Sequence, residues 1–141
     1  MTITLDATID APLDHLWSMI ADFPNLMRWH PGVERCETLG VGVGAVRRLY
    51  FADFWAAEKL ELLDNDQHIL RYAIIDGSNP ASKGLRGTIS LSAGDEGQTN
   101  LTWTSGVDPD REDAAFLDAY LQTYYPERIE HLRQAVTSPR A

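Results

Sequence analysis

Between residues 33 and 107 the chain carries six short apolar segments separated only by turn residues, and this pattern limits the possible folds most strongly. Connecting residues such as 64–66 (Asp-Asn-Asp) and 94–97 (Gly-Asp-Glu-Gly) favour tight turns. Strands joined this closely lie antiparallel, because a parallel pair needs a crossover of a dozen or more residues. The sequence therefore predicts an antiparallel meander with strands at 33–39, 45–51, 55–63, 68–75, 85–93 and 100–107.

The residues before the meander predict one more strand and two short helices. Residues 2–10 alternate apolar and polar side chains, which is typical of a half-buried strand. Asp10 is then a candidate helix cap, with Pro12 in the first turn. The helix that follows has an apolar stripe of Leu13, Leu16, Trp17 and Ile20. A second short helix is expected from 22–25 through Trp29.

The residues after the meander change to a helical period. Apolar positions recur at helical spacing from Ala114 to Ala135, and Arg128 falls within the same repeat. Pro126 lies inside this segment and predicts a kink or a break. One long C-terminal helix is the only element large enough to cover a face of the sheet. We expect an α+β fold, a curved seven-stranded antiparallel sheet wrapped around this helix, in a single domain of residues 1–141.

Such a fold implies a cavity, because one helix cannot fill the concave face of so long a sheet. The net charge of −9 disfavours nucleic acid and anionic membranes as partners. The single cysteine, Cys36, cannot form an internal disulfide, and the start of the chain has no signal-peptide pattern. These features predict a cytoplasmic protein. Neither a metal site nor a cofactor motif is expected from the histidine and glycine spacing.

Four motifs carry a resemblance to a known family. They are 12–17 (Pro-Leu-Asp-His-Leu-Trp), 44–47 (Gly-Ala-Val-Arg), 58–64 (Glu-Lys-Leu-Glu-Leu-Leu-Asp) and 72–77 (Tyr-Ala-Ile-Ile-Asp-Gly). Over essentially its whole length the chain resembles the START-like (SRPBCC, helix-grip) superfamily, which includes polyketide cyclases and dehydratases. It is more distantly similar to plant abscisic-acid receptors. Residues 51–54 (Phe-Ala-Asp-Phe) differ from the receptors' Ser-Gly-Leu-Pro-Ala gate, and Leu85 stands where an aromatic residue is usual.

The resemblance implies which residues face the cavity. It assigns Arg47, Glu58 and Tyr72 as catalytic candidates, and it alone places Arg47 inward rather than Arg48, because the alternation fits either. The implied substrate-binding residues are Glu34, Trp29, His30, Leu49, Phe51, Ile74, Trp103, Ser105, Phe116, Tyr120 and Tyr124. The charged residues among them have two interpretations. In the first, they form an ion-pair network in which each charge already has a partner. In the second, they bind a polar ligand atom and move a proton.

Three functions are compatible with these sequence features. The first is a polyketide cyclase/dehydratase-like enzyme that uses cofactor-independent general acid/base catalysis on an aromatic substrate. The second is a non-catalytic binding or carrier protein, and the third is an interaction module with a filled core. We favour the enzyme slightly over the carrier. In both of these the expected partner is a hydrophobic or aromatic small molecule, and homodimerisation is left open.

Overall fold

The seven strands in the described part of the chain form one antiparallel sheet with the order β1-β7-β6-β5-β4-β3-β2. The computed structural model describes residues 2–79, 83–106, 110, 112 and 114–137. The strands are β1 (Thr2–Ile9), β2 (Arg35–Leu39), β3 (Val46–Tyr50), β4 (Trp55–Asp64), β5 (Ile69–Gly77), β6 (Arg86–Ala93) and β7 (Thr99–Gly106). The helical elements are α1 (Leu13–Ile20), the 3-10 helices η1 (Phe23–Arg28) and η3 (Asp95–Gly97), and the long helix α2 (Ala114–Thr137).

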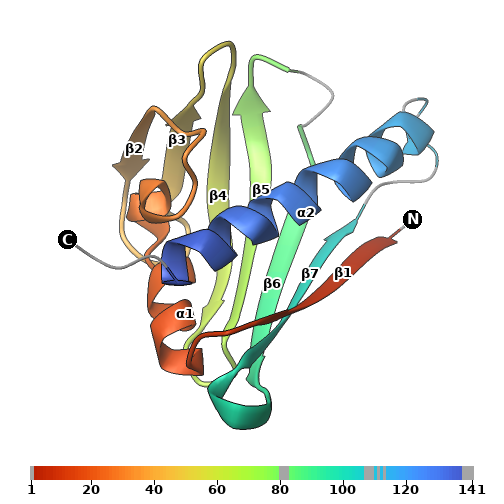
Figure 1. The fold of residues 1–141 in the computed structure, drawn as a ribbon. Helices are drawn as coiled ribbons and strands as arrows, with labels where there is room; N and C mark the ends of the chain where they lie inside the picture. The colour runs from red at the N-terminus through yellow and green to blue at the C-terminus, as the bar shows by residue number, and fades with distance from the viewer. Residues whose placement is uncertain (1, 80–82, 107–109, 111, 113, 138–141) are drawn as a thin grey trace.

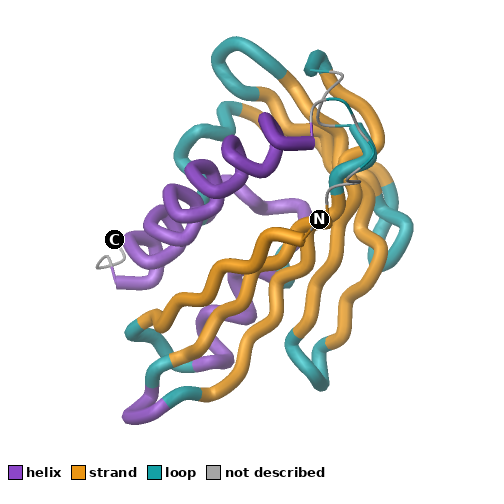
Figure 2. The backbone as a smooth tube through the Cα atoms, turned by 90° about the vertical axis from the view of Figure 1, so that its right-hand side faces the viewer, coloured by secondary structure: helices purple, strands orange, loops and turns teal. Residues whose placement is uncertain are grey.

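The sheet curves around α2, which crosses its concave face (Figures 1 and 2). Strand β1 returns to pair with β7, so the first strand forms one edge of the sheet and β2 forms the other. The register of β4 against β5 shifts between Ala57 and Glu58 and again between Leu60 and Leu62. Such bulges bend a strand and increase its twist, which favours the observed curvature. The predicted fold class is confirmed.

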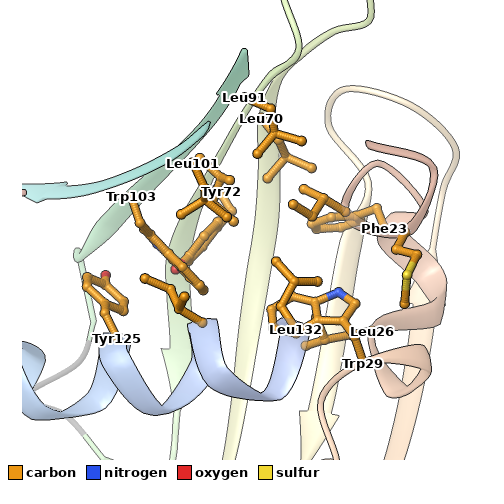
Figure 3. Packing of buried hydrophobic residues seen from close by; sticks show 14 of the residues in the cluster. Phe23, Leu26, Trp29, Leu70, Tyr72, Leu91, Leu101, Trp103, Tyr125 and Leu132 are labelled. Carbon is orange, nitrogen blue, oxygen red and sulfur yellow. The ribbon is translucent and has the colours of Figure 1, made fainter. Parts of the chain in front are cut away.

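One face of α2 is buried against the sheet. Its buried side chains are Leu117, Leu121, Tyr125, Ile129 and Leu132. This spacing of three and four residues follows the 3.6-residue turn of an α-helix. In Figure 3, Tyr125 extends from α2 toward Trp103 of β7, while Leu132 lies beside Leu26 and Trp29 from the η1 region. The apolar core therefore joins the sheet, α2 and the η1 segment.

Three local predictions can be compared directly with the structure. Helix α1 begins at Leu13 with Pro12 as its cap residue and no side-chain capping bond, so Asp10 does not cap it. Helix α2 continues through Pro126 without a break. The proline is exposed, so water can reach the carbonyl that loses its amide donor there. The predicted strand that included Val33 starts only at Arg35, because Val33 is buried in the preceding loop.

Candidate ligand-binding site

A cavity of about 320 Å³ lies between α2 and the strands β4 to β6, and we call it the outer chamber. Its wall is mainly aromatic and aliphatic, with Glu58 and Tyr72 among the polar groups. The apolar lining includes Phe51, Phe54, Ile74, Leu85, Leu117 and Leu121. Phe54 stacks on Phe51 with ring centroids 4.2 Å apart, and this pair forms part of the chamber wall at the β3–β4 connection.

A second cavity of about 30 Å³, the inner chamber, adjoins the first. The two chambers share Phe51, Glu58, Tyr72 and Tyr124 as lining residues. The remaining wall of the inner chamber is formed by Leu26, Trp29, His30, Arg47, Leu49, Ile89, Trp103 and Arg128. The shared side chains place the two spaces next to each other.

Arg47 and Glu58 form a buried ion pair at the boundary of the chambers. They are direct cross-strand partners on β3 and β4, so their side chains leave the same face of the sheet. Arg47 Nε and NH2 donate to Glu58 Oε1 at 2.9 and 2.7 Å, and NH1 donates to the carbonyl of Phe23 at 3.1 Å. The Arg47 guanidinium also lies 4.1 Å from the centroid of the Phe23 ring. Each nitrogen of the Arg47 guanidinium therefore already has an acceptor.

The ring of Tyr72 occupies the space that Gly87 leaves open because glycine has no Cβ. It pairs across β5 and β6 with Gly87, and a Cβ on Gly87 would lie 2.4 Å from both Cζ and Oη of Tyr72. Burial raises the pKa of the Tyr72 hydroxyl well above its usual value, and its hydrogen bond with Tyr125 acts in the same direction. The hydroxyl stays protonated at neutral pH and acts as a hydrogen-bond donor.

His30 belongs to the loop after η1 and is buried against α2. Its Nδ1 lies 3.2 Å from the amide nitrogen of Gly32, and its Nε2 lies 3.3 Å from Arg128 NH1. Burial, reinforced by the charge of Arg128, lowers the pKa of His30 to about 3. The imidazole is therefore neutral at physiological pH. A neutral imidazole has one acceptor nitrogen, so His30 accepts a hydrogen bond from only one of these two donors.

Arg128 links His30 to a second histidine. Its NH1 lies 3.2 Å from His131 Nδ1, and its guanidinium lies 4.4 Å from the centroid of the Tyr124 ring. NH2 donates at 3.2 Å to Glu127, whose side chain is 61% exposed, whereas that of Arg128 is only 13% exposed. Arg128 is not among the site residues expected from the sequence. An arginine within the apolar repeat of the helix was the signal that could have identified it.

Two buried donors at the inner chamber lack a hydrogen-bond partner within the described part of the chain. They are Nε1 of Trp103 and Nε of Arg128. Trp103 is 4% exposed and stacks on Tyr125 with ring centroids 4.7 Å apart. An unpaired buried donor is costly, so two of them around one small cavity indicate a place for an acceptor.

Most of the residues assigned from the resemblance line one or both chambers. The structure brings together Arg47, Glu58, Tyr72, Trp29, His30, Leu49, Phe51, Ile74, Trp103, Phe116, Tyr120 and Tyr124. Two do not line either chamber. Glu34 lies in the loop before β2, and its side chain is exposed. Its backbone amide donates to the carbonyl of Tyr50. Ser105 is buried, but its Oγ donates to the Arg86 carbonyl at 2.9 Å and it shares a hydrogen bond with Tyr125.

The aromatic row on α2 lies at the rim rather than at the centre of the buried face. Phe116 and Tyr120 border the outer chamber, but they are 67% and 47% exposed. The helix directs Leu117, Leu121 and Tyr125 inward instead. Phe116, Tyr120 and Tyr124 thus line the outer chamber from a row that lies one residue, about 100° around the helix axis, away from the most buried row.

Other kinds of site find little support in the described residues. They contain no cluster of three His, Cys, Asp or Glu side chains arranged to hold a metal ion. Helix α2 is long, but no helix within the described ranges is apolar enough to cross a lipid bilayer.

A curved antiparallel sheet wrapped around a C-terminal helix, with a cavity between them, is the helix-grip (START-like) architecture. Residues 1–137 match the model of the family described as polyketide cyclase/dehydrase and lipid transport. The chain belongs to this family, and the resemblance seen in its sequence is confirmed.

Comparison with individual proteins gives the same result for the fold. The abscisic acid receptor PYL10 of Arabidopsis thaliana is 35% identical over 94 residues, which cover 62% of this chain and 51% of the receptor. The match thus spans about half of the receptor's length. A Nitrosospira multiformis protein superposes with a TM-score of 0.81 at 21% identity, covering 98% of this chain and 97% of that one. XoxI from Bacillus cereus gives 0.82 at 21% identity, with 96% and 94% covered. At such identity these two structures show the shared fold alone.

Proposed function

We propose that the chain is one ligand-binding domain, comprising residues 1–141, that holds a small molecule with an apolar or aromatic body in the outer chamber. The observation that carries this proposal is the cavity of about 320 Å³ with its largely aromatic and aliphatic wall. Ligand pockets usually measure roughly 300–1,000 Å³ and combine an apolar wall with a few polar groups. The family description and the name of the receptor relative, which both refer to small organic molecules, support the same function.

Binding of N-phenyl-1-naphthylamine, an uncharged fluorescent probe, tests this proposal. The wild-type protein should bind the probe with an increase in fluorescence. Ile74→Trp should lower the affinity at least tenfold, because Ile74 lines the outer chamber and the larger ring fills it. Ile75→Trp is the matched control, since Ile75 is the next residue of β5 and is 39% exposed. Equal binding by both variants, or none by the wild type, would contradict the proposal.

General acid/base catalysis is a second candidate function, favoured by the placement of Glu58. Its carboxylate group lines both chambers beside the protonated hydroxyl of Tyr72. We propose that Glu58 removes a proton from the carbon next to a ligand carbonyl, and that the Tyr72 hydroxyl exchanges its hydrogen bond with Tyr125 for one to the resulting enolate oxygen. Arg47 then serves as a positioning residue that holds Glu58, because its own nitrogens are already engaged.

Hydrogen–deuterium exchange of 2-tetralone, an aromatic ketone with acidic protons beside its carbonyl, separates catalysis from binding. A catalyst should accelerate the exchange, and Glu58→Gln should abolish the acceleration while the affinity for N-phenyl-1-naphthylamine stays within about threefold. Glu61→Gln is the control, because Glu61 lies on the same strand outside both chambers. If the wild-type protein binds the probe but does not accelerate exchange, the carrier function is favoured over the enzyme.

A further inference from the structure

We propose that the inner chamber binds an anionic oxygen of the ligand, such as the carboxylate of a small aromatic acid, through Arg128 and Trp103. This inference rests on the proposed function, because it names the chemical class of the molecule whose apolar body lies in the outer chamber. It assigns ligand recognition to Arg128 of α2, whereas the sequence pointed to Arg47.

The first argument is the pair of unpaired donors. Nε of Arg128 and Nε1 of Trp103 are both buried without a hydrogen-bond partner among the described residues, and both residues line the inner chamber. Native proteins seldom leave buried donors unpaired, because each one loses its bonds to water and gains nothing in return. Tryptophan and arginine side chains supply donors only, so the missing partner is an acceptor.

The second argument is the charge of the inner chamber. Its lining contains the two arginines Arg47 and Arg128 and the single carboxylate Glu58. Glu58 accepts two hydrogen bonds from Arg47, and His30 is neutral. One positive charge, that of Arg128, is therefore left without a carboxylate inside the chamber. Its partner Glu127 is 61% exposed and does not line this space.

The third argument is size and continuity. A volume of about 30 Å³ admits one small polar group, comparable to a single water molecule, but not an aromatic ring. The inner chamber adjoins the larger outer chamber, with which it shares the lining residues Phe51, Glu58, Tyr72 and Tyr124. A molecule with a ring in the outer chamber and a carboxylate directed inward fits both spaces.

The arginine that binds the anion is held in position by its neighbours. His30 Nε2 lies 3.3 Å from NH1 of Arg128, and the centroid of the Tyr124 ring lies 4.4 Å from the guanidinium. These contacts leave Nε as the nitrogen without a partner. His30 is thus a positioning residue, and its neutral state adds no competing positive charge beside Arg128.

Isothermal titration calorimetry at pH 7.5 with 2-naphthoate and its neutral isostere 2-naphthamide tests the inference. The wild-type protein should bind the carboxylate at least tenfold more tightly than the amide. The net charge of −9 works against anions in general, so such a preference must have a local origin. Arg128→Met should remove the preference, because it should weaken binding of the carboxylate much more than binding of the amide. Trp103→Phe, which removes only the indole donor, should weaken naphthoate binding at least threefold.

Arg133→Met is the matched control, because Arg133 is also on α2 but lines neither chamber. It should keep the preference of the wild type. Circular dichroism establishes that each variant is folded, and if Arg128→Met is not, Arg128→Lys and Trp103→Phe still test the subsite. If the wild type binds both probes equally, the anion subsite is refuted and the proposed function stands. If it binds neither of them nor N-phenyl-1-naphthylamine, both proposals fail.

Discussion

Replacing Gly87 with alanine tests whether the position of Tyr72 depends on the missing side chain across the β5–β6 pair. The added Cβ would lie 2.4 Å from Cζ and Oη of Tyr72 and 2.7 Å from its Cε1. Carbon atoms in favourable contact lie about 3.5–4.0 Å apart, so the ring must move by about 1 Å. It is restrained by the hydrogen bond with Tyr125 and by the neighbouring guanidinium of Arg47, 5.9 Å from the ring centroid.

Overpacking of this kind costs about 1–3 kcal/mol. Alanine is intrinsically better than glycine in a strand by about 0.5–1 kcal/mol, which offsets part of that cost. We therefore expect Gly87→Ala to lower the free energy of unfolding by about 1–2 kcal/mol. The displaced ring should also reduce the affinity for N-phenyl-1-naphthylamine, because Tyr72 lines both chambers.

Urea denaturation followed by circular dichroism measures the cost, and Gly106→Ala is the control. A Cβ on Gly106 would meet no atom within 4 Å, so this variant should be as stable as the wild type or slightly more stable. In a double-mutant cycle, Gly87→Ala should cost little when Tyr72 is already alanine. The reasoning is refuted if both glycine variants are equally stable, or if the cost of Gly87→Ala persists without the Tyr72 ring.

Two further predictions concern the buried polar groups. Folding lowers the pKa of His30 from 6.5 to about 3, so between these pH values the imidazole is protonated in the unfolded chain and neutral in the folded protein. Lowering the pH through this range therefore favours the unfolded chain, and the free energy of unfolding decreases. Relative to a His30→Gln variant, the wild type should lose about 2–3 kcal/mol of unfolding free energy between pH 7 and 4.5 in urea titrations, whereas a constant difference would contradict the neutral buried histidine. For the ion pair, Arg47→Met and Glu58→Gln should each lower the melting temperature, because each leaves a buried group without its partner. Arg47→Met combined with Glu58→Leu should melt near the wild type; a double variant that melts below both single variants would mean that the pair stabilises the fold in its own right.

The order and type of the elements could be predicted from the sequence, because local patterns determine them. Alternating side chains and short Gly- and Asp-rich turns indicate antiparallel strands wherever they occur. The helical repeat after residue 114 likewise predicted α2, and only one long helix was available to cover the sheet. These conclusions needed no knowledge of which residues meet across the fold.

The direction of individual side chains depended on the tertiary structure. The alternation of β3 allowed either Arg47 or Arg48 to face inward, and packing against Phe23 and Glu58 buries Arg47. A rotation of α2 by one residue exchanges an inward row at 116, 120 and 124 for one at 117, 121 and 125. Periodicity defines the width of a helix face but not the exact residue at its centre, which depends on the shapes that pack against it.

The cluster at the inner chamber is the clearest example of information absent from the local sequence. His30 and Arg128 are 98 residues apart, and Trp103 lies on a third element, β7. Each looks ordinary in its own segment. Only the closure of the sheet over α2 brings them to one cavity, because burial and hydrogen-bond satisfaction depend on which segments meet in space rather than on their neighbours along the chain.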